Sequence, residues 1–133
     1  MSDTKEAVTA LLADYNKALG ESDADAVAAL YAEDGVVMPP FTPTAAGREA
    51  VRLTYGGIFK AIQLTITFPI AEIVELTADW AFARTNSVGT SLDHASGVSS
   101  PWAGQELFVF QRDAAGVWKI ARYCFSPTAA PGQ

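Results

Sequence analysis

The chain has 133 residues, of which half are hydrophobic and 18% are charged, and its formal net charge is −6 at pH 7. This length and balance predict a single globular domain over residues 1–133, and no apolar run approaches the roughly 20 residues that a membrane helix needs. The acidic balance also argues against a nucleic-acid partner, because nucleic-acid binders rely on clustered Lys and Arg.

Two short amphipathic helices are expected at the start of the chain. Apolar residues recur at helical spacing over residues 3–19, where a glycine follows as a stop. Ser22 or Asp23 then caps a second helix. Each helix carries one tyrosine on its apolar side, Tyr15 on the first and Tyr31 on the second, where a phenol points into a core or a pocket.

A short strand, a loop and a third helix follow. We expect Gly35 to end the second helix, residues 36–38 to form the strand, and the Pro39-Pro40 pair to terminate it. Residues 41–46 are typical of a loop. The third helix has its apolar side chains at i, i+4, i+7, i+8 and i+11, namely Val51, Tyr55, Ile58, Phe59 and Ile62.

From Leu64 onward, the hydrophobic repeat changes from about 3.6 residues to about 2, which indicates strands. A loop rich in Ser and Gly over residues 93–101 is expected to rim a site. Helices followed by antiparallel strands predict an α+β fold, in which three N-terminal helices pack on a strongly curved, mixed and mostly antiparallel sheet. A sheet that curves around helices in this way forms a cone, and the open end of the cone is a natural place for a ligand pocket.

The expected strands cover residues 64–68, 70–76, 80–91, 105–112 and 117–126, with turns at 77–79 and 113–116.

A family resemblance runs over nearly the whole chain. It is strongest over residues 11–40, LLADYNKALGESDADAVAALYAEDGVVMPP, moderate around residues 47–59 and weaker along the strands. Here the chain resembles the nuclear transport factor 2-like (cystatin-like) superfamily, and within it the ketosteroid isomerases and SnoaL-like polyketide cyclases. Proteins of the SgcJ/EcaC type are similar in length and texture. The resemblance implies the cone fold but no single reaction, because this fold hosts isomerases, cyclases, dehydratases, hydrolases and binding modules.

The resemblance also implies roles for individual residues. Tyr15 falls where ketosteroid isomerases place the tyrosine that hydrogen-bonds the substrate oxyanion, and Glu106 falls where they place a carboxylic acid that is kept neutral to donate a second hydrogen bond. Tyr31 and Tyr55 fall where some members place supporting tyrosines. Pro39 takes the place of the aspartate that shuttles the proton, so ketosteroid isomerase activity is not expected.

Strand alternation puts Arg84 and Asn86 on one face, which by similarity looks into the cone and makes the pocket more polar than one for a steroid. Two states of Glu106 are therefore open: a neutral acid beside Tyr15, or a carboxylate in a salt bridge with Arg84. Arg84 is also suited to clamp a ligand carboxylate. The other expected ligand-binding residues are Met38, Phe59, Phe108, Tyr123 and Phe125.

No spacing of Cys, His and carboxylates predicts a metal site, and no Gly-rich phosphate loop predicts a cofactor. If the protein is catalytic, the base is unassigned: a substrate group, water, Asp34 or His94 would have to serve. Asp34 is more typical of a surface turn, and His94 of a solvated loop. The tryptophans Trp80, Trp102 and Trp118 are expected to cover the sheet or a dimer face.

The expected function is binding of a small, largely hydrophobic ligand, with cofactor-free isomerase, cyclase or dehydratase chemistry on a ketone-like or polyketide-like compound. The alternative is a non-catalytic ligand carrier or a dimeric assembly module, which the missing base favours and the Tyr/Glu set opposes. A homodimer is expected, because Leu107 and Val109 face outward if Glu106 faces the cone. The polar, acidic start of the chain and the single cysteine, Cys124, favour a cytoplasmic protein.

Overall fold

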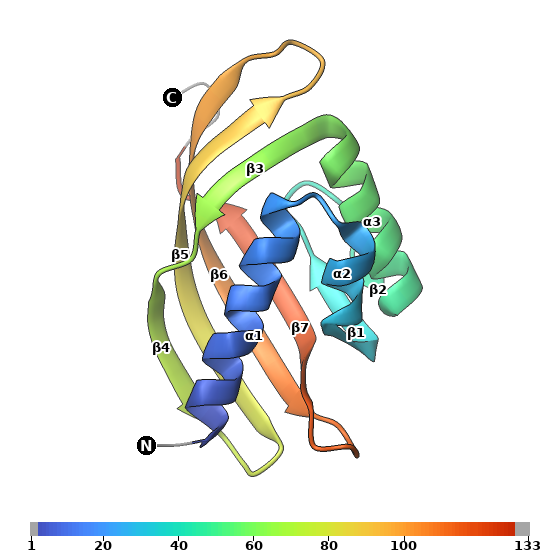
Figure 1. Cartoon of the computed structure of the whole chain (residues 1–133), viewed down its shortest axis with the longest axis vertical. Helices are drawn as coiled ribbons and strands as arrows, with labels where there is room; N and C mark the ends of the chain where they lie inside the picture. The colour runs from blue at the N-terminus through green and yellow to red at the C-terminus, as the bar shows by residue number, and fades with distance from the viewer. Residues whose placement is uncertain (1–2, 130–133) are drawn as a thin grey trace.

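A curved, open sheet of seven strands forms one side of the protein, and the helices pack against it (Figure 1). In this computed structural model, which describes residues 3–129, the strand order is β2-β1-β7-β6-β5-β3, with β4 also paired to β5. Only β1 and β7 pair in parallel among these strands, so the predicted α+β fold with a mixed, mostly antiparallel sheet is confirmed. The strands are β1 (Tyr31–Met38), β2 (Ala45–Ala46), β3 (Ile62–Thr67), β4 (Ile70–Glu75), β5 (Trp80–Asp93), β6 (Ser99–Arg112) and β7 (Trp118–Pro127).

Helix α1 (Asp3–Gly20) lies across the sheet and contacts β3, β4 and β7 (Figure 1). Helix α2 (Ala24–Ala29) is capped by Asp23, whose carboxylate accepts a hydrogen bond of 3.0 Å from the backbone N–H of Ala26. Helix α3 (Arg48–Ala61) packs beside α2 and β1. The predicted apolar stripe of α1, which consists of Val8, Leu11, Leu12, Tyr15 and Leu19, is buried, and so is Ala18.

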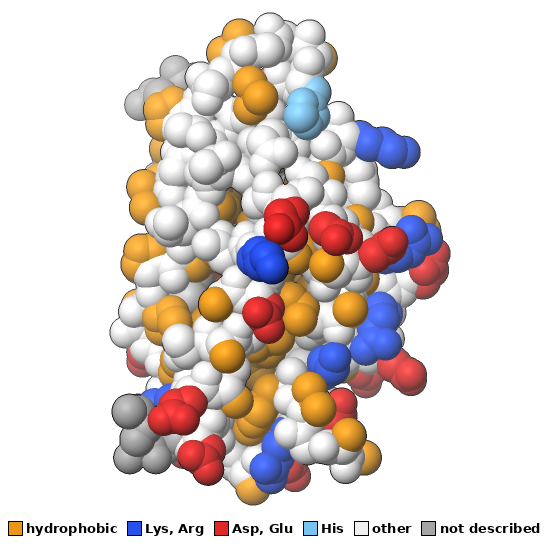
Figure 2. All heavy atoms as spheres, viewed as in Figure 1, with side chains coloured by type: hydrophobic (Ala, Val, Ile, Leu, Met, Phe, Trp, Pro, Cys, Tyr) orange, Lys and Arg blue, Asp and Glu red, His pale blue; other side chains and the backbone are white. Residues whose placement is uncertain are grey.

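Charged side chains are concentrated away from the far end of the β5–β6 hairpin. Residues 94–104 include no Lys, Arg, Asp or Glu. Figure 2 accordingly shows the red and blue side chains mainly over the helices and the lower part of the molecule, and few at its upper end. No helix in residues 3–129 is long and apolar enough to cross a membrane.

The second helix ends earlier than predicted, and Tyr31 belongs to a strand. From Leu30 onward, strand pairing with β7 replaces helical hydrogen bonds. The backbone N–H of Ile120 donates to the carbonyl of Leu30, and Tyr31 is in register with Ile120. Gly35 therefore does not stop a helix but lies in the irregular part of β1, where an added Cβ would come within 2.9 Å of the Ala32 carbonyl oxygen. Tertiary strand pairing thus overrides a weak local helix signal.

The β5–β6 hairpin is longer than predicted, and its loop is shorter. Strand pairing continues to Leu92 and Ser99, so the loop expected over residues 93–101 is confined to residues 94–98. A smaller difference occurs before α3, where β2 pairs with β1 inside the expected loop over residues 41–46. The turns at 77–79 and 113–116 are present, and Asp113 accepts two backbone hydrogen bonds in the second of them.

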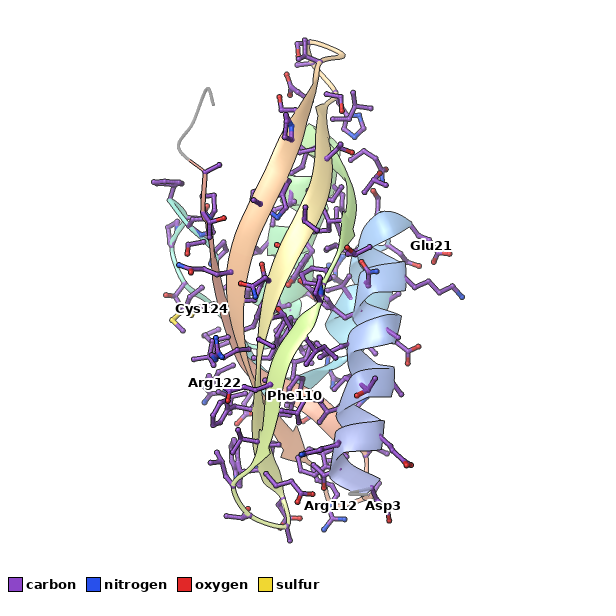
Figure 3. All side chains as sticks on the ribbon, turned by 90° about the vertical axis from the view of Figure 1, so that its left-hand side faces the viewer. Asp3, Glu21, Phe110, Arg112, Arg122 and Cys124 are labelled. Atoms are coloured by element: carbon purple, nitrogen blue, oxygen red, sulfur yellow. The ribbon has the colours of Figure 1, made fainter. Side chains whose placement is uncertain are left out.

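The two faces of β5 are the reverse of those predicted. Its buried side chains are Ala81, Ala83, Thr85 and Ser87, whereas Arg84 and Asn86 are exposed. Arg84 forms an ion pair with Glu72 of the neighbouring β4, so it has a partner without being buried. The sheet surface away from α1 is seen in Figure 3, where Arg122 and Cys124 project on the side opposite that helix.

Candidate functional site

A cavity of about 200 Å³ lies between α1, α3 and the inner face of the sheet. Its walls are mainly apolar, with side chains contributed by both helices, β3, β6 and β7. Pro39 and Pro40, after β1, form part of the wall. The polar side chains of the lining are Tyr15, Thr42, Tyr55, Ser87, Trp102, Glu106 and Tyr123.

Three tyrosine hydroxyls form a buried hydrogen-bond chain at one end of the cavity. The hydroxyls of Tyr15 and Tyr55 are 2.8 Å apart, and those of Tyr55 and Tyr31 are 2.7 Å apart. Each ring lies on the apolar side of its own element, α1, α3 or β1, so packing of the two helices against the sheet brings them together. The guanidinium group of Arg48 donates to the Tyr31 carbonyl oxygen and ties the start of β1 to α3.

Two phenols of this chain, Tyr15 and Tyr55, line the cavity, whereas Tyr31 does not. Tyr31 is fully buried, and within residues 3–129 its hydroxyl has Tyr55 as its hydrogen-bond partner. Either hydroxyl of each pair can donate, and the Tyr15 hydroxyl also forms a hydrogen bond with that of Tyr123. Burial also raises the pKa of all three phenols well above the usual range, so they stay neutral and can donate.

Aromatic packing holds Tyr15 in position. The Tyr15 ring lies edge-on to Phe108 and to Tyr123, at centroid distances of 5.5 and 5.7 Å. Phe108 and Tyr123 stack at 4.0 Å, and Tyr123 stacks on Phe125 at 5.2 Å. Tyr123 lines the cavity as Tyr15 and Tyr55 do, and burial raises its pKa in the same way.

Glu106 is the acidic residue of the cavity lining, and its carboxyl group accepts hydrogen bonds from two hydroxyl groups. It is only 5% exposed, with Thr85 Oγ1 2.6 Å from Oε1 and Ser87 Oγ 2.5 Å from Oε2. Trp102 Nε1 donates in turn to Ser87 Oγ at 2.7 Å. Burial raises the pKa of Glu106, and the hydrogen bonds from Ser87 and Thr85 oppose that rise.

The salt bridge considered between Arg84 and Glu106 is therefore wrong. Thr85 stands directly opposite Glu106 in the β5–β6 ladder, and directly opposed residues share a face of an antiparallel sheet. Arg84, one residue earlier, must point to the other side. The physical reason is the cost of burying a guanidinium group, which β5 avoids by turning its small residues inward.

The predicted ligand-binding residues divide into two groups. Tyr15, Tyr55, Glu106, Tyr123 and Phe125 line the cavity. The others do not belong to its lining: Tyr31, Phe59 and Phe108 are buried behind it, Met38 is 41% exposed, and Arg84 and Asn86 lie on the outer face.

Sequence reasoning missed Thr85, Ser87 and Trp102. Trp102 was expected to cover the sheet or a dimer face, whereas it lines the cavity. The correct phase of alternation along β5 would have identified the two hydroxyl residues, since Thr85 and Ser87 follow the small residues Ala81 and Ala83 at every second position.

The other candidates for a base lie elsewhere. Asp34 and His94 are exposed and do not line the cavity, whereas Pro39 does. No group of three or more His, Cys, Asp or Glu side chains that could hold a metal ion occurs among residues 3–129. The arrangement thus offers phenol donors, here called the phenol end, and one carboxyl group, here called the carboxyl end, on the walls of one apolar cavity.

Comparison with known proteins places this geometry in a family. A family model described as a SnoaL-like domain matches residues 1–123. The crystal structure of a ketosteroid isomerase-like protein from Erwinia carotovora atroseptica has a TM-score of 0.93 and 35% sequence identity, covering 98% of this chain and 100% of that one. A search of curated proteins found no match.

Two more distant structures share the fold. A candidate scytalone dehydratase from Novosphingobium aromaticivorans has a TM-score of 0.80 and 21% identity, covering 95% of this chain and 85% of that one. A nuclear transport factor 2-like superfamily protein from Salmonella enterica has a TM-score of 0.82 and 17% identity, covering 96% and 93%. The chain therefore belongs to the SnoaL-like domain family.

Proposed function

We propose that this protein binds a small, largely hydrophobic, ketone-like or polyketide-like compound in its cavity and carries out cofactor-free chemistry of the isomerase, cyclase or dehydratase type. The observation that supports this most strongly is the tyrosine cluster, because Tyr15 and Tyr123 bring neutral hydroxyl groups to the wall of an apolar cavity. The relatives named as ketosteroid isomerase-like and as a candidate scytalone dehydratase support the same class of chemistry.

Tyr15 and Tyr123 are the proposed oxyanion donors. When Tyr31 donates to Tyr55 and Tyr55 donates to Tyr15, each hydroxyl polarises the next, which strengthens Tyr15 as a donor to the ligand. A carbonyl oxygen beside Tyr15 and Tyr123 would gain from them as negative charge develops on it, because the donors are already in place in a site of low dielectric constant.

The size of the cavity limits the ligand. A cavity of about 150 Å³ accommodates benzene, and pockets for larger ligands measure about 300–1,000 Å³. At about 200 Å³, this cavity suits a substituted single ring or a small two-ring compound. A steroid is too large for it, and Pro39 at the wall supplies no base, so ketosteroid isomerisation is not part of the proposal.

Tetralone and naphthol are suitable first probes of this proposal, one a ketone and the other a phenol. Calorimetric titration should show binding that Tyr15→Phe weakens by about 2- to 10-fold, the value of one neutral hydrogen bond. Ile58→Trp, which fills the cavity from α3, should abolish binding. Leu53→Trp is its matched control, because Leu53 lies on the exposed side of the same helix. Equal binding by parent and Ile58→Trp would contradict the cavity as the site.

A non-catalytic carrier is the second candidate. It is favoured by Pro39, which lines the cavity at the place where the resemblance implies a catalytic aspartate. The two functions differ in one measurable respect: a carrier returns a bound enolisable ketone unchanged. Exchange of deuterium from solvent into bound tetralone, followed by mass spectrometry, would show that the protein removes a proton and would exclude the pure carrier.

We also propose a homodimer formed through the outer face of the sheet. Leu107 is 42% exposed and Val88 is 55% exposed on this face, which gives it apolar area to cover. Leu107→Lys should then shift the protein toward monomer in sedimentation equilibrium, while Leu53→Lys on the exposed side of α3 should not. A parent that is monomeric at micromolar concentration would contradict this proposal.

A further inference from the structure

The carboxyl end of the cavity contains a second hydrogen-bond chain, which runs from Trp102 through Ser87 to Glu106. An indole N–H can only donate. Ser87 Oγ therefore accepts the hydrogen bond from Trp102, and its own hydroxyl proton is free to form the hydrogen bond to Glu106. Thr85 donates to the other carboxyl oxygen. Both oxygens therefore accept, at 2.5 and 2.6 Å, which lies in the range of charge-assisted bonds to an ionised carboxylate.

Gly104 provides the space for this chain. It is buried on the inner face of β6 between Trp102 and Glu106, directly opposite Ser87. A Cβ atom at this position would lie 2.7 Å from Ser87 Oγ, 2.9 Å from the Trp102 ring and 3.0 Å from Glu106 Oε2. Any larger residue would thus enter the contact between the indole and the hydroxyl group, so the close approach of these three side chains depends on this glycine.

Glu106 forms no ion pair within residues 3–129, and no cation contributes to the shift of its pKa. Arg84 of β5 faces outward and pairs with Glu72. The ionisable groups near Glu106 are the phenols of Tyr15 on α1 and Tyr123 on β7, which burial keeps neutral. A carboxylate held by hydroxyl donors and not neutralised by a cation keeps its basicity, and it has lone pairs to spare beyond those that Thr85 and Ser87 occupy.

We infer that Trp102 and Ser87 are positioning residues that hold Glu106 ionised as the proton acceptor of the cavity, and that the ligand is an enolisable ketone. This inference rests on the proposed function and supplies its base. A Glu106 oxygen takes a proton from the carbon next to the carbonyl, and the C–H electron pair forms the enolate, whose oxygen accepts from Tyr15. Return of the proton from Glu106 to the same carbon restores the ketone, and in a ketone with a β,γ double bond its return to the γ carbon of the dienolate gives the conjugated isomer, with no oxidant or reductant required.

para-Nitrophenol tests the state of Glu106, because its neutral and ionised forms absorb at different wavelengths. At a pH where the free probe is partly ionised, we expect it to bind as the neutral phenol and donate to Glu106, so that adding protein lowers the phenolate absorbance. A rise in phenolate absorbance, as a neutral Glu106 donating beside Tyr15 would produce, overturns the inference and leaves ligand binding intact. Failure of tetralone, naphthol and para-nitrophenol to bind would instead contradict the proposed function.

Trp102→Phe tests the positioning role, since it keeps a ring and removes the N–H donor. Carbon-13 NMR of labelled glutamate should show the Glu106 titration midpoint moving to higher pH, and para-nitrophenol affinity should fall by about 2- to 10-fold. Trp80→Phe, at the start of β5, is the matched control and should change neither. Gly104→Ala should move the midpoint in the same direction as Trp102→Phe, and Gly56→Ala, where an added methyl group meets open space, should not. An unchanged midpoint in a folded Trp102→Phe variant overturns the inference.

Discussion

The two polar ends of the cavity are built in different ways. The phenol end combines three neutral hydroxyls from α1, α3 and β1, which come together only when both helices pack on the sheet. The carboxyl end is made within one hairpin: Thr85 and Ser87 stand on β5, opposite Glu106 and Gly104 on β6. The first end therefore depends on helix docking, and the second on the register of two strands.

This difference extends to the strength of the contacts. A hydrogen bond between neutral groups contributes about 0.5–1.5 kcal/mol, and one to a charged group about 1.5–3 kcal/mol. The phenols lose little if one hydroxyl is removed from the end of their chain, whereas removal of a donor from Glu106 leaves a buried carboxylate under-satisfied. The phenol end is thus suited to donate to a ligand, and the carboxyl end is suited to hold one charge in a fixed place.

The largest expected effect comes from the residue that connects the two ends. Phe108 is fully buried, packs against Tyr15 and Tyr123, and follows Glu106 on the inner face of β6. Phe108→Ala should lower the free energy of unfolding by about 3–5 kcal/mol, through lost contacts and the cavity left behind. Urea unfolding measures this, and Phe41→Ala is the matched control, because Phe41 is 93% exposed and should change stability little. A loss below about 1 kcal/mol would show that the two ends do not share this support.

A pair of variants compares the two ends directly. Ser87→Ala removes a donor from Glu106 and should cost about 1.5–3 kcal/mol at neutral pH. Tyr31→Phe removes the hydroxyl at the far end of the phenol chain and should cost only about 0.5–1.5 kcal/mol. Both are measured by urea unfolding at one pH. If Tyr31→Phe proves the more costly variant, Glu106 is not ionised in the folded protein.

The same difference explains how much of the site could be predicted from sequence. The inward faces of α1 and α3, with Tyr15 and Tyr55, were predicted correctly because helical periodicity is a local property of the chain. The inward face of β5 was not, because it depends on the pairing of Thr85 with Glu106, and a shift of one residue exchanges the two faces of a strand.

The loop of the β5–β6 hairpin is a second difference from the sequence prediction. Residues 99–101 appeared loop-like because residues 93–101 are rich in Ser and Gly, but they pair with β5, and Trp102 then lies beside Ser87. The charge of Arg84 was the better guide, because an unpaired guanidinium group is expensive to bury. Tyr31 shows a similar limit: its burial was predicted correctly, but its strand depends on pairing with Ile120, which is distant in sequence.

The smallest expected effect is the pH dependence that Glu106 gives to stability. Burial raises the pKa of Glu106 in the folded protein above its ordinary value, so the folded state binds this proton more tightly than the unfolded state does. The free energy of unfolding of the parent should therefore fall as pH rises from the ordinary glutamate value through the raised value. Glu106→Gln cannot titrate, so its stability relative to the parent should increase over that interval and then level off. Urea unfolding of both proteins from about pH 4 to pH 8 measures the difference. The change should be modest, because Thr85 and Ser87 oppose the rise in pKa. A relative stability that decreases over the same interval would mean that folding lowers the pKa of Glu106, as a cation near it would do.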